Sequence, residues 1–378
     1  MKSVLKKLFV IFYSSLLYFS MYAVDVTSLV KGSVIASAIG DAMGKVTEFK
    51  APEQIFQVYP NGIRSFNDFK PQDFWLDKNG NYVAPYTDDT AMAKLTLEVL
   101  IESRQKTWDL DTTMEELAKA FVKDMHAPKG WTYPERAPGN ASMKNTRELE
   151  RRLTIGIEQW KPTWWKPWTL WQSPWWAVGG LNDGGCGSVM HAFPFGLVFA
   201  EDPEKAAKWA VKHSLLTHGA PIAQAACAAM AVGVAYAVRQ EKPEICAQKM
   251  IEAARAYDHK TADMMEEVVN TASKIPQNLS LQELFEYSKP VFQKFEGWAA
   301  HDAIAATLYI FLVSHNDVKK AIYLGVHTPG DSDSLACMAG ALVGAYVGIE
   351  QLPKDWIKTV EGSEELLNLA FQASQLIT

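Results

Sequence analysis

Cysteine is scarce in this sequence, and the few cysteines present follow no pattern. Four occur among 378 residues, with no CxxC pair and no regular spacing. An exported chain can pair its cysteines, but this sequence shows no disulfide framework. Cys227 and Cys337 lie in alanine-rich stretches, where we expect them to be small buried side chains.

Segments of alternating β-branched residues are almost absent, which excludes an extensive β-sheet. Only residues 51–86 are expected to hold a short hairpin. Hydrophobic residues make up 48% of the chain and charged residues 21%, a composition typical of a globular protein. The sequence predicts an all-α fold, a single compact orthogonal helical domain over residues 24–378. Its expected helices cover 25–50, 88–103, 112–125, 204–215, 219–240, 243–257, 260–273, 281–295, 298–314, 317–325 and the stretch after 331.

The sequence also lacks an excess of positive charge, since its formal net charge is −6. Residues 1–23 contain three lysines and no acidic residue, so the remaining chain carries −9 without those three charges. Such an acidic chain is poorly suited to non-specific nucleic-acid binding. We therefore expect no nucleic-acid partner.

Residues 1–23 have the layout of a signal peptide. Lys2, Lys6 and Lys7 precede an apolar run, and Ala23 is suited to a cleavage site. The run is short for a membrane span, although Met21 is a poor residue at the −3 position and an uncleaved anchor is the alternative. No later apolar run looks long enough to cross a bilayer. We expect export to the periplasm or beyond the cell, with no stable membrane span once the leader is removed.

Small residues recur every fourth position in two predicted helices. The first series is Gly32, Ala36, Gly40 and Gly44, and the second is Ala336, Gly340, Gly344 and Gly348. Residues at this spacing lie on one face of a helix, where small side chains let another backbone approach closely. Because glycine inside a helix costs about 1 kcal/mol relative to alanine, such a series needs a packing reason. Our hypothesis is that these two helices are central and pack closely, on each other in the simplest case.

The segment YTDDTAM places Asp88 and Asp89 between Thr87 and Thr90 at the start of a predicted helix. One explanation is a plain N-cap, since a helix start needs a capping oxygen and favours acidic residues in its first turn. Four oxygen-bearing side chains in a row exceed that need. A cation site is the competing explanation.

A second cluster, Asp331, Asp333 and Ser334, also opens a predicted helix. Asp331 as a simple cap is again the alternative, but Asp331 and Asp333 flank a turn and can both point beyond the helix end. The two clusters together offer carboxylate and hydroxyl oxygens, which suit hard cations such as Mg²⁺, Mn²⁺ or Ca²⁺. Four carboxylates would repel one another, and two divalent ions would neutralise them. The pairing favours a metal centre over two caps.

A third acidic element is GDAMGKVTEF, in which Asp41 and Glu48 follow the first glycine series. An isolated glutamate beyond a helix end is usually solvated. If the glycine series packs this helix against the one that begins at Asp331, Glu48 reaches the metal site. It is then a candidate general acid or base.

Five motifs, taken together, resemble the ADP-ribosylglycohydrolase family over about residues 30–353. They are GDAMGKVTE, YTDDTAM, NDGGCGSVMHAFPFG, LLTHGAPIAQAA and GDSDSLACMAGALVGAYVG, in the family's order. TDDT alone is a weak signal, whereas TDDT with GDSDS and GDAMG is specific. The resemblance implies an all-α domain with two divalent cations, Mg²⁺ or Mn²⁺. It implies hydrolysis of the bond at the anomeric carbon of ADP-ribose, in an ADP-ribosylated protein or small molecule, by a chain expected to be a monomer.

Matched by motif, the resemblance assigns roles to individual positions. It implies metal ligands at Thr87, Asp88, Asp89, Asp331, Asp333 and Ser334. The candidate catalytic residues are Glu48, Asp88 and Asp89. The positions implied to bind ADP-ribose are Gly185, Gly187, Ser188, Met190 and His218.

Two departures from the family pattern leave the substrate preference open. Met190-His191 stands where many relatives have Met-Arg, and Pro329-Gly330 replaces the usual Gly-Gly. A non-catalytic ADP-ribose-binding or structural protein of the same fold is therefore one alternative. An isoprenoid enzyme that holds Mg²⁺-diphosphate on aspartate-rich helices is another, but the DDxxD pattern of such enzymes is missing after Asp88-Asp89.

Residues 127–187 show no helical periodicity and are expected to be irregular. Within them lies a tryptophan-rich insert at about 155–180, with seven tryptophans from Trp160 to Trp176. One interpretation is a lid whose aromatic rings pack on the domain. The other is a surface for a partner, a substrate or a membrane interface.

Overall fold

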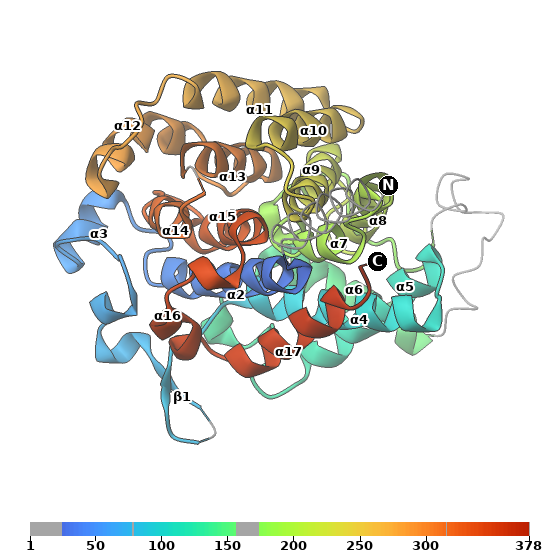
Figure 1. Cartoon of the computed structure of the whole chain (residues 1–378). Helices are drawn as coiled ribbons and strands as arrows, with labels where there is room; N and C mark the ends of the chain where they lie inside the picture. The colour runs from blue at the N-terminus through green and yellow to red at the C-terminus, as the bar shows by residue number, and fades with distance from the viewer. Residues whose placement is uncertain (1–24, 78, 156–173, 315, 378) are drawn as a thin grey trace, which may run out of the picture.

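The computed structural model describes residues 25–77, 79–155, 174–314 and 316–377, and helices dominate them (Figure 1). The α-helices are α2 Val26–Lys45, α3 Pro52–Val58, α4 Asp88–Lys106, α5 Leu110–Met125, α6 Asn140–Ile155, α7 Phe193–Val198, α8 Pro203–Ser214, α9 Pro221–Val238, α10 Pro243–Arg255, α11 His259–Ala272, α12 Leu281–Lys294, α13 Ala300–Ser314, α14 Val318–Val326, α15 Ser332–Val347, α16 Lys354–Thr359 and α17 Ser363–Ser374. Short 3-10 turns are η1 Phe66–Asp68, η2 Pro71–Asp73, η3 Pro134–Arg136, η6 Cys186–Ser188 and η7 Ile349–Gln351. The expectation of an all-α fold is confirmed.

Helices α2 and α15 pack against each other at the centre of the molecule, as the glycine series predicts (Figure 1). A Cβ atom at Gly40 would lie 2.1 Å from the carbonyl oxygen of Ala336. One at Gly344 would lie 2.3 Å from that of Gly32. Contacts this short leave no room for a side chain, so the two backbones touch. Because low numbers on α2 meet high numbers on α15, the helices are antiparallel, and the end of α2 lies beside the start of α15.

The other helices surround this pair in layers (Figure 1). Helices α10, α11 and α12 form the outer layer at the top of the view, above α13 and α9, while α4 and α17 lie on the opposite side of α2. Both α9 and α13 are apolar nearly all round because both are buried between other helices.

Helix α9 corrects one expectation about apolar runs. By length and composition alone, its 18 residues are enough to cross a membrane, although we expected no such run after the leader. Within the protein, 78% of this span is buried. A buried core helix has the same composition as a membrane span, because neither meets water.

Residues 51–86 contain the short hairpin that was expected, with strand β1 Trp75–Leu76 paired antiparallel to strand β2 Tyr82–Val83. Residues 127–187 are less irregular than expected, since they include α6. The inner face of α6 is formed mostly by polar residues, which hid its periodicity. These buried residues are Ser142, Asn145, Thr146 and Leu149. Asn145 is held by polar contacts and not by apolar packing: its amide donates hydrogen bonds to the Thr217 carbonyl (2.6 Å) and to Asp183 (2.8 Å).

Candidate active site

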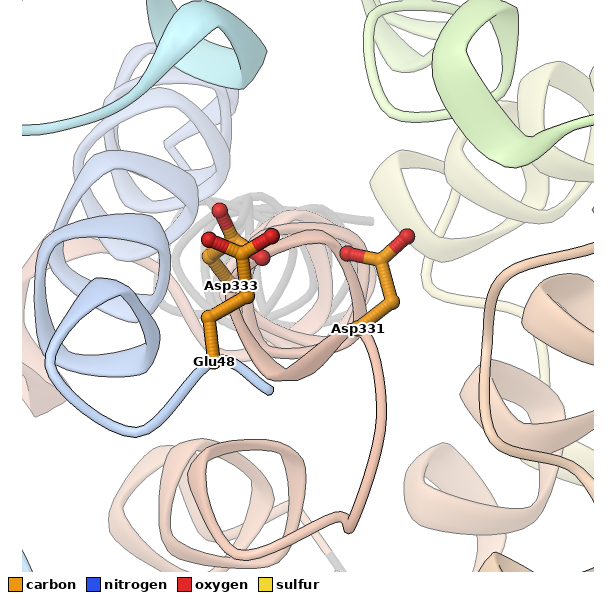
Figure 2. A group of neighbouring side chains, drawn as sticks. All are labelled: Glu48, Asp331 and Asp333. Atoms are coloured by element: carbon orange, nitrogen blue, oxygen red, sulfur yellow. The ribbon is translucent and has the colours of Figure 1, made fainter. Parts of the chain in front are cut away.

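The antiparallel packing of α2 and α15 brings three carboxylates together. Glu48 lies just beyond the C-terminal end of α2, and Asp331 and Asp333 lie at the N-terminal end of α15. One carboxylate oxygen from each of these residues lies within 4.8 Å of the others. Figure 2 shows Glu48 and Asp333 on the side toward α2, with Asp331 across from them. The glycine packing therefore places Glu48 beside the second acidic cluster, as the sequence hypothesis required.

The first acidic cluster is held in place by Asp41, a buried residue of α2. One of its carboxylate oxygens accepts a hydrogen bond from the Thr87 backbone N–H (2.8 Å). The other accepts from the backbone N–H (2.9 Å) and the hydroxyl (2.5 Å) of Thr90. Asp41 thereby fixes the first turn of α4 to the central helix pair. The first backbone N–H groups of a helix have no acceptor within the helix, and here Asp41 of α2 supplies an acceptor for those of Thr87 and Thr90.

Thr87 is the N-cap of α4, since its hydroxyl oxygen accepts a hydrogen bond from the Asp89 backbone N–H (3.3 Å). The capping explanation is thus correct for Thr87, and the two aspartates are left for another purpose. Asp88 accepts one hydrogen bond, from the Gly139 backbone N–H (3.3 Å). Asp89 accepts from the Thr87 hydroxyl (3.0 Å) through one oxygen, while its buried Oδ1 has no partner among the described residues.

The start of α15 shows a similar surplus of oxygen atoms. Asp331 occupies the N-cap position, yet its side chain makes no capping hydrogen bond. Instead, its Oδ2 accepts a hydrogen bond from the Cys186 thiol, with a sulfur–oxygen distance of 2.7 Å. Asp333 accepts from the Ser334 backbone N–H (3.0 Å). A plain cap therefore does not explain Asp331.

The two clusters meet, as the electrostatics of Asp89 shows. Burial raises the pKa of Asp89 well above its usual range, and the charges of Asp41, Asp88 and Asp331 raise it further. A hydrogen bond from the side chain of Ser334, in the other cluster, lowers the same pKa. The sequence hypothesis that the two helix starts face each other is borne out by this contact.

The remaining carboxyl groups are also harder to ionise than usual. Burial, followed by the charges of Glu48 and Asp89, raises the pKa of Asp333. Burial and the charge of Asp331 raise the pKa of Glu48 to about 8. Among the described residues, no lysine, arginine or histidine forms an ion pair with any of these groups. Buried charges are normally paired or bind a metal.

Divalent cations fit this donor set. The surrounding atoms are carboxylate and hydroxyl oxygens, the ligands that Mg²⁺ and Mn²⁺ prefer. The unpartnered Oδ1 of Asp89 is a buried acceptor that a cation would satisfy. The expected ligands Thr87, Asp88, Asp89, Asp331, Asp333 and Ser334 all have side chains no more than 5% exposed.

The glycine-rich loop lies beside Asp331, because Cys186 stands between Gly185 and Gly187. A Cβ atom at Gly187 would lie 2.9 Å from Cε1 of His218, so glycine is needed there to let this ring approach. Burial lowers the pKa of His218 to about 4, which keeps the imidazole neutral at pH 7. Gly185, Gly187 and His218 are thus brought together as predicted.

Ser188 and Met190 occupy different surroundings from those expected of ligand-binding side chains. The Ser188 hydroxyl lies in the core, 3.1 Å from the Ser214 hydroxyl. Met190 is 2% exposed and its sulfur lies 3.8 Å from the Ser334 hydroxyl, so it packs behind that residue. Both side chains are therefore buried, and the expected contact of these two residues with ADP-ribose stays a prediction.

His191, which departs from the family pattern, is fully buried and points into the core. Its Nδ1 lies 2.7 Å from Nε2 of His213, and Phe121 packs edge-on against its ring. Burial lowers its pKa well below the usual range. The neutral pair takes no part in the acidic site.

The sequence left two residues of the site without a role. Asp41 positions the first turn of α4, and Cys186 donates a hydrogen bond to Asp331. The available signal for Asp41 was its place in GDAMG, an acidic residue inside an otherwise apolar helix. The available signal for Cys186 was its position between two glycines of the loop.

Most of the tryptophan-rich insert, residues 156–173, lies outside the described residues. Its last two tryptophans, Trp175 and Trp176, are 8% and 1% exposed. The Trp175 carbonyl accepts a hydrogen bond from Arg152 of α6 (2.7 Å). The end of the insert therefore packs on the domain. For residues 156–173, the lid and the partner surface both stay predictions.

Comparisons with known proteins identify relatives across nearly the whole chain. A family model described as ADP-ribosylglycohydrolase matches residues 23–378. ADP-ribosylhydrolase ARH3 of Bos taurus is 23% identical over 357 residues, which cover 89% of each chain. ADP-ribosylarginine hydrolase Tri1 of Pseudomonas putida is 24% identical, over 90% of this chain and 76% of its own. A solved structure, described as an ADP-ribosylglycohydrolase-related protein complex, aligns with a TM-score of 0.58 and 22% identity over 94% of this chain and 99% of that chain, which shows the same fold.

Proposed function

Because the chain belongs to the ADP-ribosylglycohydrolase family, we propose that it is a metal-dependent hydrolase of the bond at the anomeric carbon of ADP-ribose. It releases ADP-ribose from a modified protein or from a small molecule. Relatives whose names describe hydrolysis of ADP-ribosyl bonds, ARH3 and Tri1, support this assignment. The observation that carries it is the cluster of carboxylates beside a glycine-rich loop, which have no ion-pair partner among the described residues.

Two divalent cations, Mg²⁺ in our proposal, would be held by Thr87, Asp88, Asp89, Asp331, Asp333 and Ser334. When bound, such ions polarise substrate oxygens and lower the pKa of a water molecule. The unpartnered Oδ1 of Asp89 and the hydroxyl of Ser334 are oxygen donors from opposite clusters of this set. Mn²⁺ has the same preference for oxygen ligands and is the second metal to be assayed.

One carboxylate among Glu48, Asp88 and Asp89 accepts a proton from the attacking water, and the others orient this water, as positive charge develops at the anomeric carbon. Asp88 and Asp89 are fixed by α4, which Asp41 anchors. Glu48 lies on a segment beyond the end of α2, and burial and Asp331 raise its pKa to about 8. A group with such a pKa holds and releases a proton near neutral pH, which suits a general acid or base.

The loop of Gly185, Gly187 and Ser188 binds the diphosphate and adjoining ribose through backbone N–H groups. Glycine lets a phosphate approach the main chain closely. His218 packs against this loop as a neutral imidazole, which offers one donor and one acceptor to a ribose hydroxyl. Met190 follows this loop in the chain, and its sulfur packs behind Ser334.

The test is a panel of substrates that carry ADP-ribose on arginine nitrogen, on serine oxygen and on a small molecule. Released ADP-ribose is measured with Mg²⁺, with Mn²⁺ and with EDTA. We expect metal-dependent release from at least one linkage. Binding of ADP-ribose without turnover of any linkage would instead identify a non-catalytic binding protein.

We also propose that residues 1–23 direct export and that the mature chain acts as a monomer outside the cytoplasm. The charged start, the apolar run and Ala23 support this proposal. N-terminal sequencing of the expressed protein should find Val24 as the first residue. Retention of residues 1–23 in the membrane fraction would instead identify an anchor, and sedimentation of the mature chain tests the monomer.

A further inference from the structure

A cavity of about 480 Å³ lies between the C-terminal end of α2 and the β1–β2 hairpin. Its walls include apolar and aromatic groups as well as charged ones: Lys45, Val46, Tyr59, Trp75, Pro85 and Glu135. Volumes of 300–1,000 Å³ and mostly apolar walls with a few polar groups are typical of small-molecule sites. No role in the proposed reaction has been given to this cavity.

Lys45, the last residue of α2, has an ammonium group without an acceptor. Its Nζ atom is buried and has no hydrogen-bond partner among the described residues. The nitrogen lies 4.6 Å from the centre of the Trp75 ring, which attracts a cation but accepts no full hydrogen bond. A buried ammonium left without an acceptor costs free energy, so this group lacks a partner that an anionic ligand can supply.

Further cations surround the same indole ring. Lys129 lies 4.9 Å and Arg136 lies 5.3 Å from the ring centre. Arg136 already has a partner, since its guanidinium pairs with Glu361 at 2.9 Å. These residues therefore add positive charge around Trp75, and Glu361 offsets this charge only in part.

The acidic residues of the cavity leave Lys45 unpaired. The Oδ2 atom of Asp73 accepts hydrogen bonds from the Tyr59 hydroxyl (2.9 Å) and from the Lys70 backbone N–H (2.7 Å). Glu135 is an exposed residue of the rim. Neither carboxylate accepts a hydrogen bond from the Lys45 ammonium. The charges of Asp41, Glu361 and Asp333 also act on this ammonium, but among the described residues none of them forms an ion pair with it. An anionic occupant of the cavity can supply the missing acceptor.

The cavity lies on the Glu48 side of the acidic cluster. Lys45 and Glu48 are separated by one turn of chain, and Glu48 lies toward α2 in Figure 2. The glycine-rich loop contacts the opposite member of the cluster, Asp331, through Cys186. A ligand whose diphosphate rests on that loop therefore directs the group bonded to its anomeric carbon toward Lys45. This placement rests on the proposed function.

We propose that the Lys45 cavity binds an oxyanion, either a carboxylate or a phosphate, on the group that is bonded to the anomeric carbon of ADP-ribose. The Lys45 ammonium donates hydrogen bonds to the oxyanion, and Trp75 packs against the apolar body that carries it. The chain thereby selects targets with an acidic group close to the ADP-ribosylated position.

The first test needs no turnover. Phenyl phosphate, benzoate and neutral benzyl alcohol are titrated calorimetrically into the full chain, with Mg²⁺ and again with EDTA. We expect saturable binding of an anion under both conditions, none of benzyl alcohol, and a loss of at least about tenfold in Lys45→Met. Lys31→Met is the matched control, because Lys31 lies on the same helix and its ammonium forms a cation–π pair with the Phe371 ring. Unchanged anion binding by Lys45→Met, or no anion binding by the wild type, overturns the proposal.

The second test compares two ADP-ribosylated peptides that differ by Glu or Gln next to the modified residue. We expect the wild type and Lys31→Met to prefer the Glu peptide in kcat/KM, and Lys45→Met to lose that preference. A preference ratio that Lys45→Met leaves unchanged contradicts the proposal. Trp75→Leu, which removes the cavity wall, provides a second variant if Lys45→Met does not fold. If no substrate is hydrolysed, the proposed function fails. The titrations still show whether the cavity binds an anion through Lys45.

Discussion

The hydroxyl of Thr90 donates a 2.5 Å hydrogen bond to the carboxylate of Asp41, which joins the first turn of α4 to the middle of the central helix pair. The Thr90 backbone N–H donates to the same oxygen at 2.9 Å. Neither residue is among the expected metal ligands. Their contact nevertheless determines where Asp88 and Asp89 lie relative to α15.

Replacing Thr90 by valine tests this contact. The substitution keeps the side-chain shape but leaves the buried Asp41 carboxylate with one donor fewer. We expect the free energy of unfolding to fall by about 1–2 kcal/mol and Mg²⁺ binding to weaken. Thr96→Val is the control, since Thr96 lies on the same helix and its hydroxyl donates a hydrogen bond to the Met92 carbonyl, within α4. Equal Mg²⁺ affinity in the two variants, measured by calorimetry, would show that Thr90 does not position the site.

Replacing Asp333 by alanine tests the acidic cluster itself. We expect ADP-ribose release to fall at least about a hundredfold, because a candidate ligand of the cations is lost. Asp88→Ala should have the same effect. Asp355→Ala, on an exposed position of α16, is the charge-matched control and should retain full activity. Wild-type turnover by Asp333→Ala with Mg²⁺ present would rule out the two-metal assignment.

The stability of the metal-free chain should depend on pH in a defined direction. The folded carboxyl groups of Glu48, Asp89 and Asp333 have raised pKa values, so the folded state binds more protons than the unfolded state. For Glu48, stability is lost as pH rises from the usual value of 4.5 toward about 8. Thermal unfolding in EDTA should therefore occur at lower temperature at pH 8 than at pH 6.

Added Mg²⁺ should reverse this trend. At a hundredfold excess over its dissociation constant, a bound ligand adds about 2.7 kcal/mol of stability. Because the cation competes with protons for the carboxylates, the Mg²⁺-induced rise in melting temperature should be larger at pH 8 than at pH 6. A larger rise at pH 6 would contradict carboxylate ligation. Glu48→Gln should flatten the profile of the metal-free chain.

A methyl group in the seam between α2 and α15 should be poorly tolerated. In Gly40→Ala, the new Cβ would lie 2.1 Å from the Ala336 carbonyl oxygen, so the two backbones must separate. We expect a loss of about 1–3 kcal/mol or more in the free energy of unfolding, measured by urea denaturation. Gly139→Ala is the control for stability, since its Cβ would meet no atom closer than 3.9 Å.

A methyl group at Gly187 should affect substrate binding more than folding. Its Cβ would approach Cε1 of His218 to 2.9 Å and the Ser142 hydroxyl to 3.1 Å, which pushes the ring from the loop. We expect KM for the ADP-ribosylated substrate to rise about tenfold or more with a smaller change in kcat, since binding is lost in both ground and transition states. A fall in kcat at constant KM would place His218 in the chemical step instead.

The central helix pair and the acidic site were predictable because each is marked by a recognisable pattern within one segment of the sequence. Glycine at every fourth position requires close helix packing, and the antiparallel match of Gly40 with Ala336 and of Gly344 with Gly32 follows that pattern. Oxygen-bearing residues beyond the needs of a cap indicated a cation site at Asp88 and Asp331. At Thr87 the hydroxyl caps the helix, and this cap leaves the side chains of Asp88 and Asp89 available for the proposed cations.

Other features could not be predicted, because no local sequence pattern indicates them. Helix α6 was missed because its buried face is mostly polar, with Asn145 bonded to the Thr217 carbonyl rather than packed against apolar groups. The roles of Asp41 and Cys186 depend on contacts with residues 46 and 145 positions away in the chain. Spacing along one segment carries no information about such contacts. The same holds for Lys45, whose missing partner is apparent only once its surroundings are known.

The seam between α2 and α15 also determines when the site can form during biosynthesis. It joins residues about 300 positions apart, as in the hydrogen bond from the Ser33 hydroxyl to the Ala341 carbonyl (2.8 Å). Contacts of such long separation form late, because a large loop must close first. A nascent chain that ends before α15 has the first acidic cluster but not the second. The proposed metal loading therefore follows synthesis of nearly the whole polypeptide, and a chain truncated before α15 cannot assemble the acidic cluster.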